Sequence, residues 1–183
     1  RRAAGGMGMK RWALWLPLIV FAALLALVAT GLFKPADRTV RSAMIGQPVP
    51  DFRLAPIVPG KPGLDAAMLR NGTPHLVNIF ASWCLPCIAE APQLMRLKAM
   101  GVPIEGIAIR DKPADLASFL DRNGDPYARI GDDPRSAVQL ALGSSGVPES
   151  FVVDGRGVIL LQHVGDIRPD QVDAIAAAVK GAR

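Results

Sequence analysis

The residues best suited to chemistry lie in one short segment, 80–94, with the sequence FASWCLPCIAEAPQL. It contains the only two cysteines of the 183-residue chain, Cys84 and Cys87, with two residues between them. Two thiols at this spacing can form a reversible disulfide, supply half of a zinc site or make a structural crosslink. The rest of the sequence decides between these three kinds of chemistry.

Redox chemistry is the favoured interpretation of the pair. A zinc site needs four ligands, usually from two such pairs or from added histidines, and the sequence offers only His75 and His163, far apart from each other. A purely structural disulfide that closes so short a loop restricts the unfolded chain little, because its effect grows with loop length. The zinc site and the structural crosslink are therefore the less favoured alternatives, and His75 and His163 are expected to be ordinary strand residues.

The elements predicted around the cysteines favour Cys84 as the nucleophile. Residues 75–80, HLVNIF, predict a buried strand, and residues 85–100 follow helical spacing. The predicted apolar face of this helix consists of Ile88, Pro92, Leu94, Met95 and Leu97. A thiol in its first turn lies beside unpaired amide groups and the positive end of the helix dipole, so its pKa can fall from ~8.5 to between ~3.5 and ~7.5. We expect Cys84 to attack and Cys87, one turn further along, to resolve the mixed disulfide.

The remaining pattern predicts an α/β fold in which helices cover a central mixed sheet. A strand at 102–109 and a helix at 113–123 repeat the strand and helix order of a parallel unit. Strands at 150–154 and 157–162 then predict an antiparallel hairpin. The other expected elements are short edge strands and turns at 48–63, a short helix at 135–142 and a closing helix at 169–180 with Val172, Ile175, Ala176 and Val179 facing inward.

An uncharged run at 12–33 predicts a transmembrane anchor. As a helix it would be about 33 Å long, enough to cross a hydrocarbon core of ~30 Å. It is longer than the apolar region of a cleaved signal peptide, which is the less favoured alternative. Basic residues before the run favour a cytoplasmic N-terminal segment at 1–11. We expect a polar tether at 34–47 and a folded domain at 48–183.

The net charge of +5 comes mostly from the segment that precedes the apolar run. The chain has 21 Lys and Arg residues against 16 Asp and Glu residues, and leaving out the four basic residues of segment 1–11 gives 17 against 16. This near-equal number of basic and acidic residues does not indicate a nucleic-acid-binding surface. We expect no nucleic-acid partner and no metal, and we expect a monomer.

Two segments resemble the signatures of thioredoxin-fold proteins. The first, NIFASWCLPCIAEAPQL, has an apolar strand, Trp83 before the first cysteine and Pro86 before the second. The second, GVPESFVVDGRG at 146–157, resembles the proline loop and hairpin of that superfamily. The resemblance implies a thioredoxin-like fold in which the Val147-Pro148 bond is cis and packs beside the nucleophilic sulfur. It also implies that Pro92 kinks the active-site helix.

The combination of anchor and motifs resembles one family more closely, the CcmG/DsbE-type thiol:disulfide interchange proteins of cytochrome c maturation. The motifs are VPDFRL at 49–54, Trp-Cys-x-Pro-Cys-x-x-Glu at 83–90 and Gly-Val-Pro-Glu at 146–149. This resemblance implies a single-pass protein of the bacterial inner membrane whose periplasmic domain reduces haem-site disulfides of apocytochrome c, directly or through another maturation thiol protein. A membrane electron donor of the DsbD/CcdA type would keep it reduced, and it would need no cofactor beyond its redox-active disulfide.

Other interpretations of the motifs remain open. ResA-type and TlpA-type reductases share most of them, and a thiol oxidant of the DsbA kind would carry the same cysteine pair. A tethered binding or chaperone module with a structural disulfide is an alternative of another class. The direction of electron flow depends on the reduction potential relative to the partners, which the sequence does not give.

Asn78 and Glu90 mark a departure from ordinary thioredoxins. Those proteins carry a buried aspartate six residues before the first cysteine, where this chain has Asn78, and an amide cannot take a proton from Cys87. Glu90 lies three residues after Cys87, so the two side chains share a helix face. Our hypothesis is that Glu90 tunes the pair and helps to move the Cys87 proton. The alternative is a solvated glutamate in the first turn.

Four further positions carry expectations about the partner-facing surface. The resemblance places Glu149 near the active-site groove, and the alternative is an exposed acid at the start of a strand. Trp83 is expected to be about half exposed, to shield the sulfur and to contact partners. Family members commonly have aromatic residues where this chain has Ser144 and Ser145, so this part of the surface is expected to differ.

Overall fold

The computed structural model describes residues 15–26 and 43–182, in two units. Residues 15–26 form a helix whose side chains are exposed. Within the described ranges, no helix has both the length and the apolar character needed to cross a membrane. The predicted segment 1–11, residues 12–14 and 27–33 of the predicted anchor and residues 34–42 of the predicted tether lie outside the described residues.

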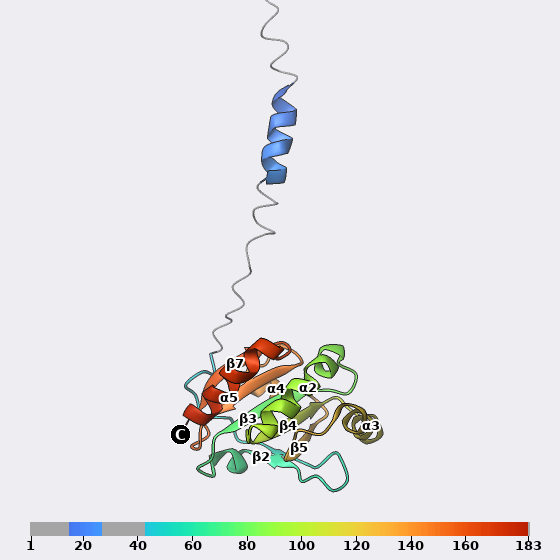
Figure 1. The fold of residues 1–183 in the computed structure, drawn as a ribbon, viewed down its shortest axis with the longest axis vertical. Coiled ribbons are helices and arrows are strands. Elements are labelled where there is room, and N and C mark those ends of the chain that lie inside the picture. The colour runs from blue at the N-terminus through green and yellow to red at the C-terminus, as the bar shows by residue number, and fades with distance from the viewer. Residues whose placement is uncertain (1–14, 27–42, 183) are drawn as a thin grey trace, which may run out of the picture. The chain divides into compact units, whose positions relative to one another are not determined.

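The domain is built on a mixed sheet of five strands in the order β5-β4-β3-β6-β7 (Figure 1). The pairs β3–β4 and β4–β5 are parallel, whereas β3–β6 and β6–β7 are antiparallel. The strands are β3 (His75–Phe80), β4 (Ile104–Ile109), β5 (Arg129–Asp133), β6 (Glu149–Val153) and β7 (Ile159–Val164). The predicted strands and hairpin are confirmed, and β5 is a strand that the sequence pattern did not predict.

Helices cover the sheet as predicted. Figure 1 shows α2 (Leu85–Ala99) and α5 (Val172–Gly181) packed together over one face of the sheet. The α5 helix follows a short 3-10 turn, η2 (Pro169–Gln171), and buries the four side chains predicted to face inward. The other helices are α3 (Pro113–Asn123) and α4 (Ala137–Ala141). The strand before the cysteines is therefore the central strand of the sheet, and the helix after them lies over the sheet beside α5.

The predicted apolar face of α2 is wrong in part. Ile88 and Pro92 are exposed, and the buried positions include Glu90 and Ala91. The buried stripe still follows helical spacing, but it is rotated so that it includes a carboxylate. An acidic side chain can occupy such a position only where other elements supply hydrogen-bond donors, and the site described below supplies them.

A small two-stranded sheet precedes β3 and covers the β5 edge. Its strands are β1 (Arg53–Leu54) and β2 (Leu64–Asp65), followed by a 3-10 turn, η1 (Ala66–Arg70). Packing is so close here that a Cβ on Gly131 would lie 2.6 Å from the Cβ of Leu54. The short edge strands expected in this region are confirmed.

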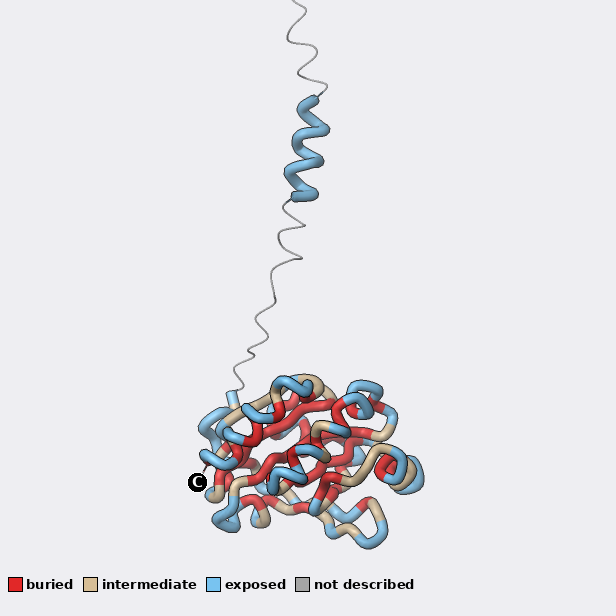
Figure 2. Tube along the Cα trace, in the orientation of Figure 1, coloured by how far each residue is buried: buried red, intermediate tan, exposed pale blue. Residues whose placement is uncertain are grey.

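The N-terminal edge of the domain contacts the β7 side of the sheet. The amide of Gly46 donates to the carbonyl of Ile159 at 2.7 Å, and Pro48 bridges to Val158. Gly46 lies within the range predicted as a tether. Figure 2 shows buried residues along the sheet strands and the inward sides of the helices, with exposed residues on the outer turns. The core therefore extends under the N-terminus of α2, where the cysteines lie.

Candidate active site

The cysteines lie where β3 gives way to α2. Cys84 is the N-cap of α2 and forms a disulfide with Cys87, with their Cα atoms 5.3 Å apart. The Cys87 amide donates to the Cys84 sulfur at 3.2 Å. This helix N-terminal amide, which also lies 3.1 Å from the Cys84 carbonyl oxygen, points at the sulfur that the prediction names as the nucleophile, and it would stabilise the thiolate after reduction. Both residues are almost completely buried.

Trp83 flanks the disulfide on the solvent side. Its side chain is 55% exposed, and its indole N–H donates to the Arg110 carbonyl at 3.2 Å. The Arg110 guanidinium carbon lies 6.0 Å from the ring centroid, a cation–π distance. Tethered in this way, the indole presents one side to the solvent next to the cysteines.

A groove of about 440 Å³ runs from Trp83 to the proline loop. The Val147-Pro148 bond is cis, as the resemblance implied, and Val147 lines the groove. Two cationic side chains, Arg110 and Arg135, also line it, as does Leu140, which is 69% exposed. The groove therefore combines apolar surface with positive charge beside the disulfide.

Asn78 and Glu90 meet in a buried network beneath the active-site helix. The Asn78 side-chain nitrogen donates to Glu90 Oε1 and to the Ser150 hydroxyl, both at 3.0 Å. The Tyr127 hydroxyl donates to Asn78 Oδ1 at 2.8 Å. The second oxygen of Glu90 accepts the Ile167 amide at 3.1 Å. The network links β3, α2, β6 and the segments before β5 and α5.

The Glu90 carboxyl is poised to change protonation near neutral pH. Burial raises its pKa from 4.5 to about 7, an effect to which the charge of Asp166 adds and which the hydrogen bonds from Asn78 and Ile167 oppose. Glu90 has no exposed surface, so the alternative of a solvated first-turn glutamate is wrong. A group that titrates near the operating pH is suited to proton transfer.

Glu149 is also fully buried, so the alternative of an exposed acid is wrong. Its carboxylate accepts the Ser144 hydroxyl at 2.7 Å, the Ser145 amide at 2.8 Å and the Gln162 side-chain amide. Ser144, Ser145 and Val147 line the groove. Glu149 therefore anchors the wall of the groove from below and is not presented at its surface.

Replacing Glu149 by alanine should destabilise the domain by about 2 kcal/mol or more, because buried donors lose their acceptor. Urea unfolding of the oxidised protein would measure the loss. The exposed acid Asp170 gives a control, since its change to alanine should alter stability by less than about 0.5 kcal/mol. Equal stabilities for the two variants would contradict the anchoring role.

Both histidines lie outside this network. His75 is buried with Nδ1 3.2 Å from Glu105 Oε1, and His163 is hydrogen-bonded to the Asp166 carbonyl. In residues 15–26 and 43–182, no three His, Cys, Asp or Glu side chains gather in a way that could hold a metal ion.

Several residues of the site were not predicted from the sequence. They are Tyr127, Ser150 and Ile167 in the network and Arg110 and Arg135 in the groove. Only Tyr127 carried a signal that could have singled it out, since it is the one tyrosine of the chain. The others are common residue types whose positions depend on the tertiary fold.

Comparisons with known proteins agree with this geometry. The model of the Redoxin family matches residues 44–179. The thiol:disulfide interchange protein HelX of Rhodobacter capsulatus is 38% identical over 164 residues, which are 90% of this chain and 93% of HelX. The thiol:disulfide interchange protein DsbE of Escherichia coli K12 is 38% identical over 167 residues, 88% of this chain and 89% of DsbE.

The fold is also similar to that of solved structures. A crystal structure of a putative thiol:disulfide interchange protein DsbE from Chlorobium tepidum superimposes with a TM-score of 0.61 at 27% identity. The match covers 75% of this chain and 96% of that protein. With its disulfide at the start of α2 and the cis proline in the neighbouring loop, the chain belongs to the Redoxin family, among the thiol:disulfide oxidoreductases of the DsbE and HelX kind.

Proposed function

We propose that this protein is a disulfide reductant in cytochrome c maturation, anchored in the bacterial inner membrane by residues 12–33 with its domain in the periplasm. The observation that carries the proposal is the placement of Cys84 at the N-cap of α2, bonded to Cys87, in a chain similar to DsbE and HelX over most of its length. The substrates would be oxidised haem-attachment cysteines of apocytochrome c, or another thiol protein that carries their electrons.

The reaction needs two exchange steps. In the reduced protein, the Cys84 thiolate attacks one sulfur of the partner disulfide, and a mixed disulfide forms as the other partner sulfur leaves as a thiolate. Cys87 then loses its proton and attacks the Cys84 sulfur. The partner leaves as a dithiol, and this protein keeps the Cys84–Cys87 disulfide. The dithiol of a membrane donor of the DsbD/CcdA type reverses these steps and restores the reduced form.

Glu90 is the group that we assign to the Cys87 proton. It lies one turn beyond Cys87 on α2, a spacing that places both side chains on one face of the helix, and both are buried. Its pKa of about 7 allows it to accept a proton from a thiol and to return it near neutral pH. Asn78 takes no proton and acts as a donor to the carboxylate.

The groove beside Trp83 is the surface that we assign to the partner. It runs from Trp83, the residue before Cys84, to Val147 of the cis proline loop, and Leu140 offers apolar surface within it. Arg110 and Arg135 line it and no acidic side chain does, which favours a partner segment with acidic residues near its cysteines. The Cys84–Cys87 dithiol itself carries the two electrons and becomes the disulfide when it gives them up, so the proposal includes no further cofactor.

Cys87→Ser should trap the partner, because the mixed disulfide then lacks the thiol that resolves it. The full chain would be produced in a bacterium that makes c-type cytochromes, and disulfide-linked proteins would be identified by mass spectrometry. We expect apocytochrome c or a maturation thiol protein. Cys84→Ser is the matched control and should trap none. If Cys87→Ser captures only unrelated secreted proteins, the proposed substrate is wrong.

Further measurements on this protein distinguish the other interpretations. Equilibration with glutathione measures the reduction potential, and a strongly oxidising disulfide would indicate a DsbA-like oxidant. A binding module with a structural disulfide predicts that Cys84 of the reduced protein is alkylated no faster than a free cysteine and that Cys87→Ser traps nothing.

A further inference from the structure

We propose that Tyr127 is a positioning residue that holds the Asn78 amide in the orientation that donates to Glu90, and so favours the ionised form of that carboxylate. The inference deepens the role proposed above for Glu90 and rests on it for its consequence in catalysis. No part of it requires Tyr127 to touch the cysteines or the partner.

Both polar groups of the Asn78 side chain have hydrogen-bond partners in the network. Its nitrogen donates to Glu90 and to Ser150, and its oxygen accepts from Tyr127. If the amide rotated by half a turn, its oxygen would face Glu90 Oε1, and two acceptors would meet in a site closed to water. That arrangement is acceptable only when Glu90 carries a proton that it can donate. The orientation of the amide and the ionisation of Glu90 are therefore coupled.

Tyr127 favours the orientation in which Asn78 donates to Glu90. Burial raises the pKa of the Tyr127 hydroxyl well above its ordinary value, with further contributions from the charges of Glu90 and Asp125. The hydroxyl therefore stays protonated throughout the working pH range and remains available as a donor. The hydroxyl donates its proton to the amide oxygen. After a rotation it could only accept from the amide hydrogens, and its own proton would lose the acceptor that Asn78 Oδ1 provides. Tyr127 thus stabilises one orientation of Asn78 over the other.

The ring of Tyr127 is itself fixed. It stacks on Phe80 with ring centroids 4.4 Å apart and an angle of 23° between the planes. Gly106 leaves room for it, because a Cβ there would lie 3.0 Å from Tyr127 Cδ1. The Tyr127 amide donates to Asp125 Oδ1 at 3.1 Å, and Lys61 bonds to its carbonyl. The hydroxyl is held by packing and backbone contacts, so it can impose its geometry on the Asn78 amide.

The other groups that act on Glu90 do not duplicate this effect. The Ile167 amide is a fixed backbone donor, and the Ser150 hydroxyl bonds to Asn78. Asp166 raises the pKa of Glu90 through its charge. Asp125, on the far side of Tyr127, acts on the Tyr127 hydroxyl and pairs with Lys61 at 2.6 Å. Of these groups, Tyr127 is the one that bonds to the Asn78 oxygen.

Tyr127→Phe removes the hydroxyl and keeps the ring. We expect the Glu90 pKa to rise by about half a unit to one unit, since a hydrogen bond to the charged form is weakened. Carbon-13 NMR of the glutamate carboxyl groups in the oxidised protein measures it without interference from the thiols. The pH profile of thiol exchange should shift in the same direction. Phe119→Leu is the control, because Phe119 is buried and contacts the Phe80 ring and should cost stability without moving Glu90.

Two results would overturn the inference. One is an unchanged Glu90 pKa in folded Tyr127→Phe, and the other is an equal shift in Phe119→Leu. A third variant tests whether the effect passes through Asn78: in an Asn78→Ala background, Tyr127→Phe should move Glu90 no further, and a full shift there would contradict the proposed path. If Glu90→Gln leaves the pKa values of both thiols and the exchange rate unaltered, the catalytic role of Glu90 is wrong. The Glu90 pKa measured in the Tyr127 variants still decides the role of Tyr127.

Discussion

Changing Cys84 to serine should reduce thiol–disulfide exchange to the uncatalysed rate, because a serine hydroxyl cannot form the mixed disulfide. Cys87→Ser should retain the first attack, so that one equivalent of partner is bound and turnover stops. The difference follows from the positions of the two sulfurs, since Cys84 caps α2 and receives the Cys87 amide. The measurement is reduction of an oxidised Cys-x-x-Cys-His peptide, with the bound and released species followed by mass spectrometry.

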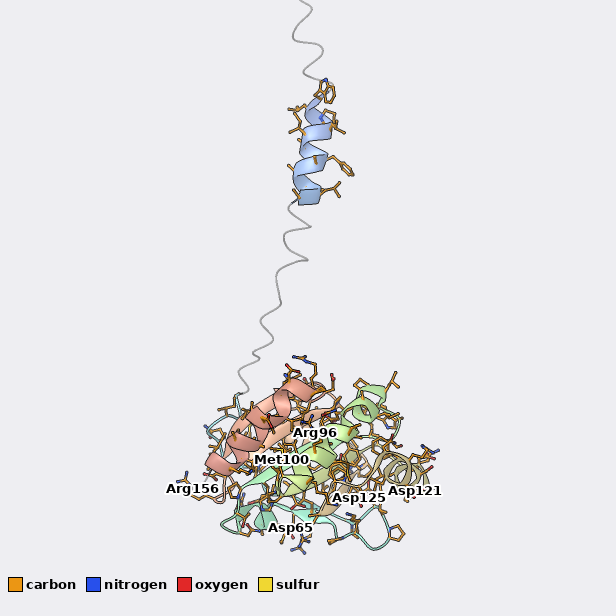
Figure 3. All side chains as sticks on the ribbon, in the orientation of Figure 1. Asp65, Arg96, Met100, Asp121, Asp125 and Arg156 are labelled. Atoms are coloured by element: carbon orange, nitrogen blue, oxygen red, sulfur yellow. A yellow bond between two sulfur atoms is a disulfide. The ribbon has the colours of Figure 1, made fainter. Side chains whose placement is uncertain are left out.

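Met100 provides a control at the other end of the same helix. It is exposed and caps the C-terminus of α2, and Figure 3 labels it together with Arg96. Met100→Ala should leave the exchange rate within about twofold, because surface changes distant from a site rarely alter it by more than ~0.5 kcal/mol. Catalysis by Cys84→Ser, or complete turnover by Cys87→Ser, would contradict the roles assigned to the two cysteines.

The stability of the oxidised domain should fall as pH rises from about 4.5 to 7, and Glu90 is the expected cause. Its pKa is about 7 in the folded protein against an ordinary value of 4.5. Between these values the folded state binds more protons at Glu90 than the unfolded state, so the free energy of unfolding decreases with pH. The contribution is fully present below the unfolded pKa and is lost as pH rises through the folded pKa. A shift of this size corresponds to about 3 kcal/mol.

Glu90→Gln should remove this slope. The absolute stability of the variant will differ, because a glutamine cannot accept both the Asn78 and Ile167 hydrogens with two oxygens as glutamate does. The test is therefore the difference between the two curves of unfolding free energy from pH 4.5 to 8.5. Asp154 also contributes to the pH dependence of stability, because hydrogen bonds from Val158 and Arg156 outweigh the effect of burial and lower its pKa. Both proteins contain Asp154, so its contribution cancels in the difference.

Asp170→Asn controls for the loss of any carboxylate, since Asp170 is exposed and its change should leave the slope intact. The charged residues Asp121 and Arg156 lie at the periphery of the domain in Figure 3, in contrast to the fully buried Glu90. Parallel curves for the original protein and Glu90→Gln would mean that Glu90 keeps an ordinary pKa.

Elements with strong local signals could be predicted from the sequence. The strand at His75–Phe80 is apolar enough to be buried at all its positions, and α3 begins at Pro113 and ends before Gly124, as proline and glycine preferences indicate. The strand β5 has the sequence RIGDD, which carries too few apolar residues to predict a strand. Its structure depends on pairing with β4 and on cover from the segment around Leu54.

The cysteine pair of the candidate site could be predicted from the sequence, and the residues around it less so. Two cysteines at this spacing after a strand indicate a redox pair, and the cis bond at Pro148 followed from the resemblance. The burial of Glu90 could not be predicted from the sequence, because its hydrogen-bond donors are Asn78, 12 positions away, and Ile167, 77 positions away. A local pattern cannot show that a carboxylate will find such partners in the core.

The bond from the Ile167 amide to Glu90 Oε2 makes one backbone signal a spectroscopic reporter of the site. When Glu90 is ionised, the amide hydrogen lies against a charged oxygen, and when it is protonated, against a neutral one. The chemical shift of that amide should follow the Glu90 titration although Ile167 lies in the segment leading to α5. The protonation of Glu90 could thus be observed during thiol exchange in a nitrogen-15 spectrum, with neither cysteine labelled.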